Sequence, residues 1–189
     1  DLRRFTQRPE PAGPVVVVLP ARLIWDKGIA VFVEAARRLR AEGVEARFAL
    51  VGDTQPSNPR SVPKEQLAAW QQAGEIEWWG RRDDMPDVFA MCHVVCLPTG
   101  YGEGVPKALI EAAACGRPIV ATDIAGCREI VGDGDNGLLV PAADAAALAG
   151  ALRRLLEDDD LRRRMGQRGR EIAQQGFDEE TMAGAIVAL

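Results

Sequence analysis

Two glutamates near the middle of the chain, Glu103 and Glu111, combine carboxylate chemistry with a sequence context that is typical of ligand sites. Glu103 lies in a glycine-rich stretch, residues 99–104, and Glu111 follows about two helical turns later. A glycine-rich turn that opens a helix exposes backbone N–H groups, and such groups bind phosphate. A carboxylate further along the helix accepts hydrogen bonds from hydroxyls, such as those of a ribose or a hexose. The pattern therefore predicts a site for a ligand that carries both phosphate and sugar.

Two cations, Arg22 and Lys27, lie between the first apolar run of the chain and the helical stretch that follows it. Positive charges at a helix N-terminus oppose the helix dipole. An anionic ligand would offset that cost and accept charge-assisted hydrogen bonds. These residues therefore suit the phosphate end of the same ligand.

Each of these residues also has an ordinary surface explanation. Glu111 can pair with Lys107, which precedes it by one helical turn. The two cations can pair with the acids nearest to them in the sequence, Asp26 and Glu34. On the residues alone, both interpretations stay open.

Apolar, β-branched runs alternate along the chain with amphipathic stretches. Strands are expected at residues 15–19, 47–51, 76–79, 94–97, 118–121 and 138–140. Helices are expected at residues 28–42, 64–73, 85–92, 105–115, 143–157 and 160–174, and from 179 onward. This alternation predicts βαβ units, and hence an α/β fold with a doubly wound, Rossmann-like parallel sheet covered by helices on both faces.

The residues that suit a ligand site follow the ends of successive strands. In a doubly wound sheet, ligands bind at the carboxyl ends of the strands, near the point where the strand order reverses. We expect that edge to carry Arg22 and Lys27, Gly52, Gly80 and Arg81, and residues 100–104.

Charge and hydropathy exclude some classes of partner. The 23 Lys and Arg residues against 28 Asp and Glu residues give a net charge of −5, without a basic face, which argues against a nucleic-acid partner. Arginines gather at residues 153–170, but interleaved acids predict a solvated helical face there. No apolar run approaches the roughly 20 residues that cross a bilayer.

The cysteines and the single histidine do not suggest a metal site. The four cysteines include no C-x-x-C pair, which argues against zinc and against a disulfide framework. Cys92, Cys96 and Cys115 lie in apolar runs and are predicted as buried thiols in a reducing compartment. Cys127 lies in a turn-like segment and is predicted to be partly exposed, while His93 is predicted to be structural.

Three further segments have structural interpretations. Residues 132–137 match G-x-G-x-x-G formally, but they precede a short strand and are predicted as a turn, not as a dinucleotide or metal site. Trp78 and Trp79 are predicted to pack in the core. The polar residues 1–14 are predicted as a linker that enters a domain spanning 15–189, so we expect the chain to be part of a longer protein.

Taken in order, several motifs resemble a known family. They are ARL…DKG at residues 21–28, LVG at 50–52, LPTGYGEG at 97–104, EAAACGRPIV at 111–120 and NGLLVP at 136–141. The chain resembles the C-terminal, donor-binding domain of the retaining glycosyltransferases of family 4, which have the two-domain GT-B architecture. The resemblance covers nearly the whole chain, from about residue 15 to residue 182.

The resemblance implies roles for the residues singled out above. Arg22 and Lys27 would hold the diphosphate of a nucleotide sugar, and Glu103, the first acid of the E-x7-E motif, would lie near the transferred sugar. These three would form the catalytic set, while Glu111, the second acid, would bind the ribose hydroxyls.

The resemblance also implies a set of nucleotide-binding residues. The loop at residues 80–82 would border the base, and backbone N–H groups at the start of the helix would approach the phosphates. Pro106 stands where the family often has glycine, so one phosphate contact common in the family is expected to be missing. Besides Arg22, Lys27 and Glu111, the set comprises Gly52, Arg81, Gly104, Val105 and Lys107.

Within this family, the chain resembles bacterial enzymes that extend lipid-linked oligosaccharides. This implies a UDP-linked donor, with N-acetylgalactosamine as the favoured sugar, and no divalent metal or other cofactor. A polyprenyl-linked or saccharide acceptor would bind an N-terminal domain outside this chain, so the chain alone should bind nucleotide weakly and transfer nothing. The expected location is the cytoplasm, with peripheral association at the inner face of the cytoplasmic membrane as a further option.

Two other classes of function remain as alternatives. A dinucleotide-dependent dehydrogenase domain would need G-x-G-x-x-G after the first strand, where this chain has ARLIWDK at residues 21–27. A non-catalytic nucleotide-binding module could retain the fold without activity. The presence of both glutamates and both cations argues for an active enzyme.

Overall fold

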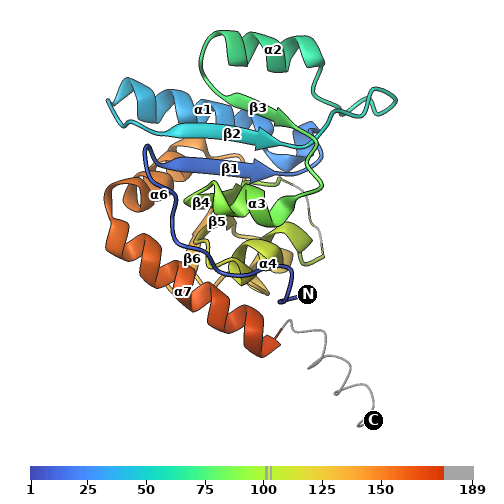
Figure 1. The fold of residues 1–189 in the computed structure, drawn as a ribbon. Coiled ribbons are helices and arrows are strands. Elements are labelled where there is room, and N and C mark those ends of the chain that lie inside the picture. The colour runs from blue at the N-terminus through green and yellow to red at the C-terminus, as the bar shows by residue number, and fades with distance from the viewer. Residues whose placement is uncertain (101, 103, 177–189) are drawn as a thin grey trace.

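The computed structural model describes residues 1–100, 102 and 104–176, which form a single parallel sheet between two layers of helices (Figure 1). The sheet has six strands in the order β3-β2-β1-β4-β5-β6. The strands are β1 (Val16–Pro20), β2 (Arg47–Val51), β3 (Glu77–Gly80), β4 (Val94–Leu97), β5 (Ile119–Thr122) and β6 (Gly137–Val140). All neighbouring strands pair in parallel, which confirms the predicted α/β doubly wound sheet. Because the order reverses between β1 and β4, the expected ligand edge lies beside these two strands.

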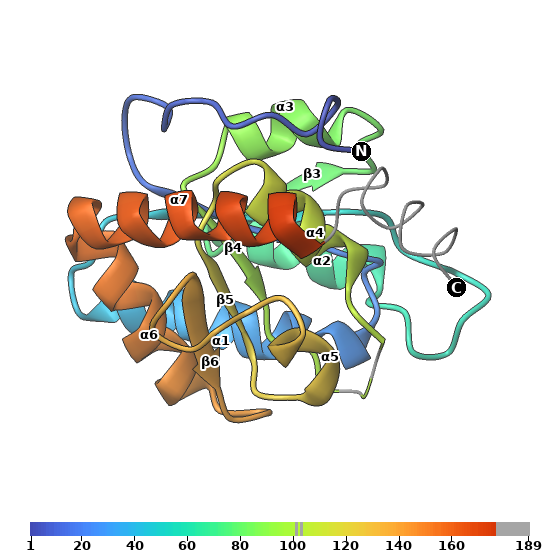
Figure 2. The same cartoon turned by 90° about the horizontal axis from the view of Figure 1, so that it is seen from below.

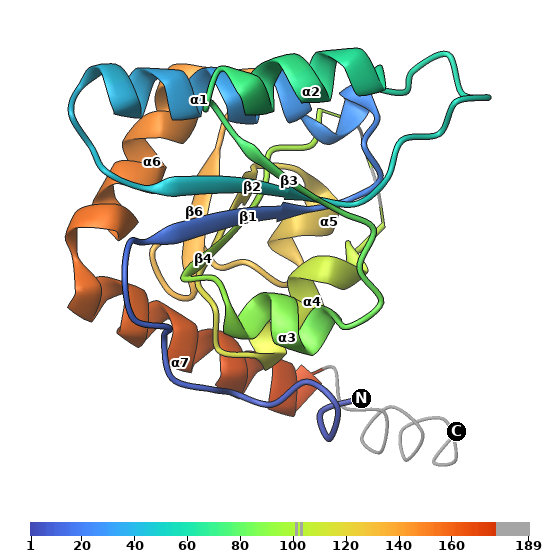
Figure 3. The same cartoon turned by 45° about the horizontal axis from the view of Figure 1, so that its top comes forward.

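Helices cover both faces of this sheet (Figure 3). α1 (Ile29–Ala41) and α2 (Lys64–Gln72) lie on one face, and α6 (Ala145–Glu157) packs against α1. α3 (Met85–Ala90) and α4 (Lys107–Ala114) lie on the other face, where α7 (Asp159–Gly176) packs against α4. The short α5 (Ala125–Arg128) was not predicted, since one helical turn is too short to show periodicity. The helix predicted from residue 179 onward lies outside the described residues.

The central strands are buried on both faces, as their continuous apolar sequences predict. The three cysteines predicted as buried thiols are buried. Cys127 is buried too, so the prediction of partial exposure was wrong. The turn-like sequence folds into α5, which directs this side chain into the core.

Trp78 and Trp79 pack against the core but remain partly exposed, because β3 is an edge strand. The Trp78 indole N–H donates to the Gly52 carbonyl at 3.0 Å. His93 is structural, as predicted: it is buried, and the Val16 backbone N–H donates to its Nδ1 at 3.1 Å. Neither the tryptophans nor the histidine adds a catalytic group.

Residues 1–14, which we call the N-terminal arm, run along the side of the domain formed by α3 and α7 (Figure 2). Phe5 is buried, and its ring lies 6.3 Å from that of Phe89 in α3. The stretch 153–170 is not wholly the solvated face that was predicted, since Arg162 is buried and binds Glu10 of the arm. The segment predicted as a linker therefore packs onto the domain.

Candidate functional site

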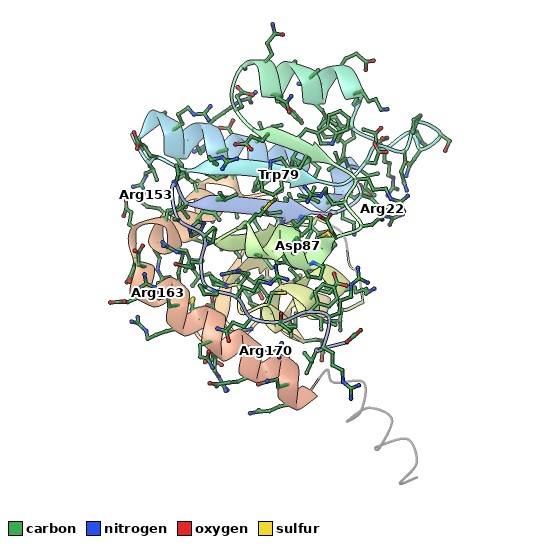
Figure 4. All side chains as sticks on the ribbon, in the orientation of Figure 1. Arg22, Trp79, Asp87, Arg153, Arg163 and Arg170 are labelled. Carbon is green, nitrogen blue, oxygen red and sulfur yellow. The ribbon has the colours of Figure 1, made fainter. Side chains whose placement is uncertain are left out.

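A cleft of about 670 Å³ opens at the carboxyl ends of β1, β2 and β3 and extends to the start of α4. A smaller hollow of about 510 Å³, lined by Lys27, Asn58 and Arg60, adjoins it. Arg22 lines both and lies just beyond the end of β1 (Figure 4). Described lining residues from the predicted set meet in the larger cleft: Arg22, Gly52, Arg81, Lys107 and Glu111.

Gly52 lines the cleft at a point where the ends of β1 and β2 approach each other closely. Its N–H donates to the Gly80 carbonyl at 2.8 Å, and the N–H of Ala21 donates to the Val51 carbonyl at 2.9 Å. Gly52 has φ of +149°, and a Cβ at this position would stand 1.8 Å from the Ala21 carbonyl oxygen. Any larger residue would push the ends of β1 and β2 apart.

The loop after β1 is tied to the loop after β4 by one carbonyl group. The Asp26 carbonyl accepts from the Gly100 N–H at 2.9 Å and from the Thr99 hydroxyl at 3.1 Å. The turn Trp25–Lys27 is thereby held between the ends of the two strands that flank the reversal of strand order. This arrangement places Lys27 at the ligand edge of the sheet.

The acids proposed as ordinary surface partners of the cations are occupied by other arginines. The Asp26 carboxylate pairs with Arg60 at 2.6 Å, and Glu34 pairs with Arg38 at 3.0 Å. Arg22 is exposed and makes no ion pair with the residues at 1–100, 102 and 104–176. The surface explanation therefore does not account for Arg22.

Glu111 lines the cleft, and 14% of its side chain is exposed. Burial raises the pKa of this carboxyl, and the positive charges of Lys107 and Arg4 oppose that shift. The predicted pair with Lys107 is present at 3.5 Å, but the lysine side chain is 88% exposed, so the contact is weak. The carboxylate thus remains suited to accept hydrogen bonds from ligand hydroxyls.

The start of α4 faces the same cleft. Pro106, in extended conformation, is the N-cap, so the helix begins at Lys107 and not at residue 105 as predicted. Its first backbone hydrogen bond runs from Leu109 N–H to the Pro106 carbonyl at 2.9 Å. The N–H groups of Lys107 and Ala108 precede that bond, and both residues line the cleft.

Some predicted residues do not join this cleft. Glu103 lies outside the described residues, so the position of the first acid of the pair stays a prediction. Gly104 and Val105 are exposed ahead of α4 and are not among the described lining residues. Lys27 lines the smaller hollow.

Other residues line the site although the sequence did not single them out. Arg4, from the N-terminal arm, lies in the larger cleft, while Asn58 and Arg60, from the loop after β2, lie in the smaller one. Arg60 could have been found, because it follows a strand whose end lies at the ligand edge. No local signal marks Arg4, which lies far from the other site residues in the sequence.

The described residues lack two kinds of feature. They contain no group of three or more His, Cys, Asp or Glu side chains that could hold a metal ion. In the same part of the chain, no helix has the length and apolar character needed to span a bilayer.

The cleft at the reversal point, the cations after β1, the helix start and the largely buried carboxylate of Glu111 together define a Rossmann-like α/β domain with a cleft suited to an anionic ligand that carries hydroxyls. Residues 14–158 match the model of the glycosyl transferases group 1 family. The chain belongs to this family.

Curated relatives from bacteria are similar over almost the whole chain. N,N'-diacetylbacillosaminyl-diphospho-undecaprenol alpha-1,3-N-acetylgalactosaminyltransferase of Campylobacter jejuni is 33% identical over 174 residues, which cover 92% of this chain and 44% of the relative. The putative colanic acid biosynthesis glycosyltransferase WcaL of Salmonella typhimurium is 34% identical over 200 residues, covering 100% of this chain and 48% of the relative. The chain therefore spans about half the length of these relatives.

Among solved structures, Anabaena Alr3699/HepE in complex with UDP-glucose superimposes with a TM-score of 0.85 at 25% identity, covering 100% of this chain and 56% of that one. The fold is the Rossmann-like half of the GT-B architecture, which confirms the predicted resemblance. Family membership also excludes the alternative of a dinucleotide-dependent dehydrogenase domain.

Proposed function

We propose that this chain is the donor-binding domain of a retaining glycosyltransferase that uses a UDP-sugar in bacterial glycan synthesis. The observation that carries the proposal is the meeting of Arg22, the start of α4 and Glu111 in one cleft at the strand ends. A nucleoside diphosphate needs cations and N–H groups for its phosphates and a hydroxyl acceptor for its ribose. The complex of Alr3699/HepE with UDP-glucose supports UDP as the nucleotide.

In this proposal the cations act on the leaving group. As the bond between the sugar and the diphosphate breaks, negative charge builds on the phosphate oxygens. Arg22, Lys27 and the start of α4 would stabilise that charge without reorganising, which is the usual origin of the largest electrostatic contribution to catalysis. Glu111 would accept hydrogen bonds from the ribose, and Glu103 would lie near the transferred sugar.

The finer substrate assignments follow the relatives. The Campylobacter jejuni relative is named as an N-acetylgalactosaminyltransferase acting on an undecaprenol-linked sugar, which favours UDP-N-acetylgalactosamine and a polyprenyl-linked acceptor. A saccharide acceptor fits the polysaccharide relatives equally well. The acceptor would bind a second domain, with peripheral association at the cytoplasmic face of the membrane. We expect no divalent metal to be needed, because the cations and the helix start would neutralise the diphosphate.

Isothermal titration calorimetry of this chain with UDP, GDP and NAD tests the proposal. We expect UDP to bind, without added metal, and NAD not to bind. Binding of NAD without UDP or GDP would overturn the proposal. A protein that carries this domain together with its acceptor domain should transfer sugar from UDP-N-acetylgalactosamine. A protein that binds UDP but transfers from no UDP-sugar would instead be a non-catalytic module.

A further inference from the structure

The N-terminal arm reaches the cleft with its first residues. Arg4 and Phe5 are among the lining residues, together with Arg82, Lys107 and Glu111. The Arg4 guanidinium donates from Nη2 to the Asp83 carbonyl oxygen at 2.9 Å, in the loop after β3. It is also close enough to Glu111 for its charge to act on that carboxylate. Arg4 thus lies between the loop after β3 and the carboxylate on α4.

Buried cations hold the arm in this position. Arg117, with 2% of its surface exposed, donates to the carbonyls of Arg8 and Pro9 at 2.9 and 3.1 Å, and to Phe89 at 2.7 Å. These partners of the guanidinium are backbone carbonyls, and two of them belong to the arm. Because a buried cation that lacks hydrogen-bond partners is costly, undocking the arm, which would remove two of these three acceptors of Arg117, is unfavourable.

Further contacts fasten the rest of the arm. Arg162 binds the Glu10 carboxylate at 3.0 Å, and the His93 ring nitrogen Nε2 lies 3.1 Å from the Pro11 carbonyl. Arg170 of α7, labelled in Figure 4, donates to the carbonyl of Phe5 at 2.7 Å, and Phe5 itself lines the cleft. The arm is thus anchored along its length and is an integral wall of the domain.

A local turn holds the backbone at Arg4 in place. The Asp1 carboxylate accepts from the backbone N–H groups of Arg3 and Arg4, each at 3.1 Å, and Phe5 anchors the turn in the core. Within residues 1–100, 102 and 104–176, the Asp83 carbonyl is the only hydrogen-bond acceptor of the Arg4 guanidinium. Most of its N–H donors therefore remain for a ligand. One side of the guanidinium lies over the Phe5 ring, 5.5 Å from the ring centroid, and the opposite side can stack on a base.

We propose that Arg4 is a nucleotide-binding residue that covers the nucleoside part of the ligand, between Glu111 and the loop at residues 81–83. This inference rests on the proposed function, because it assumes that the cleft holds a nucleoside diphosphate. The arm then completes the donor site, and the anchoring arginines Arg117 and Arg170 are positioning residues. Donor affinity becomes dependent on a docked arm.

Calorimetry with UDP and UMP tests this role in Arg4→Ala and in a matched control, Arg8→Ala. Arg8 lies on the same arm but pairs with Asp87 at 2.7 Å, outside the cleft. We expect Arg4→Ala to raise the Kd of both ligands by about tenfold, since a nucleoside contact is common to both. Arg8→Ala should leave both Kd values within about twofold, although it removes the same charge. Arg4→Lys should lie between the two, because it keeps the charge but loses the planar fork.

Each outcome separates this role from the function of the cleft. Binding of UDP by the wild type with unchanged affinity in Arg4→Ala overturns the role of Arg4 and leaves the proposed function intact. A loss for UDP without a loss for UMP overturns the nucleoside assignment. A wild type that binds neither ligand overturns both proposals. Hydrogen exchange of residues 5–12 checks the mechanism: Arg4→Ala should leave their protection unchanged, while Arg170→Met should lower both this protection and UDP affinity.

Discussion

Gly52 and Ala21 approach so closely that a Cβ on residue 52 would stand 1.8 Å from the Ala21 carbonyl oxygen. This contact joins the ends of β1 and β2, where the cleft begins, and it leaves no room for a side chain. The fold and the site therefore depend on the same backbone position.

The Gly52→Ala variant should lose both stability and binding. The clash and the positive φ of +149° force the strand ends apart, at a cost of about 2–4 kcal/mol in the free energy of unfolding. Urea unfolding measures this cost, and UDP titration of the folded variant should show weakened binding. Gly150→Ala is the control. Gly150 lies in α6 with nothing near its added Cβ, so this change should stabilise by about 0.5–1 kcal/mol. Equal stability of the two variants would contradict the role of Gly52.

The Glu111→Gln variant should bind UDP more weakly than the wild type but have a higher free energy of unfolding at pH 7. Burial raises the pKa of the Glu111 carboxyl, so the ionised form costs stability that the neutral amide does not. A raised pKa in the folded state means that the cost is absent below the ordinary value of about 4.3 and appears as the pH rises through the folded pKa. The variant should therefore be more stable than the wild type at pH 7, and the difference should shrink toward pH 4.

Urea unfolding across this pH range and UDP titration at pH 7 check that prediction. The matched control is Glu65→Gln, on the exposed start of α2 and outside the cleft, which removes the same charge and should leave the affinity for UDP unchanged. Unchanged UDP affinity in Glu111→Gln would mean that the carboxylate does not bind the ligand.

Replacement of either cation after β1 should impair transfer in a protein that carries this domain with its acceptor domain. Arg22→Ala and Lys27→Ala each remove charge that would stabilise the departing diphosphate, so we expect kcat/KM to fall by about 10²–10³-fold. Arg38→Ala, which breaks only the surface pair with Glu34, serves as the control. Steady-state kinetics with the UDP-sugar measure the effect. Near-normal kcat/KM in Lys27→Ala would count against the proposed mechanism.

His93 is the single histidine of the sequence. It should make the free energy of unfolding depend on pH between about 5 and 8, where histidine ordinarily titrates. Burial lowers the pKa of its imidazole, which accepts from the Val16 N–H in the neutral form. A lowered folded pKa means that the stabilisation is present above the ordinary value of about 6.5 and is lost as the pH falls through the folded pKa.

The wild type should accordingly be less stable at pH 5 than at pH 7. His93→Gln should be less stable at pH 7, but its stability should change less between the two values. Urea unfolding at both pH values compares the chains. The same slope in both would show that another group dominates, and hydrogen exchange of residue 16 would then identify whether this contact opens.

The strand pattern was predictable because the spacing of apolar residues is a local property of the sequence. Continuous apolar runs such as residues 16–20 and 94–97 indicate strands covered on both faces, and each predicted strand is present with small shifts at its ends. Strand-end residues such as Arg22, Gly52 and Arg81 followed from a topological rule, since parallel strands place their carboxyl ends on one edge. Helix α4 begins at Lys107, and not at residue 105 as predicted, because the backbone of Pro106 is extended.

By itself, the sequence determined the α/β class, the ligand edge and the cations and carboxylate that meet there, since each depends on short-range pattern and on chain direction. Only the tertiary structure decided that Cys127 is buried, that Arg117 and Arg162 serve as anchors, and that Arg4 lines the cleft. The physical reason is that these features depend on contacts between segments far apart in the chain. The charge of an arginine looks the same in the sequence whether water or a distant backbone carbonyl satisfies it.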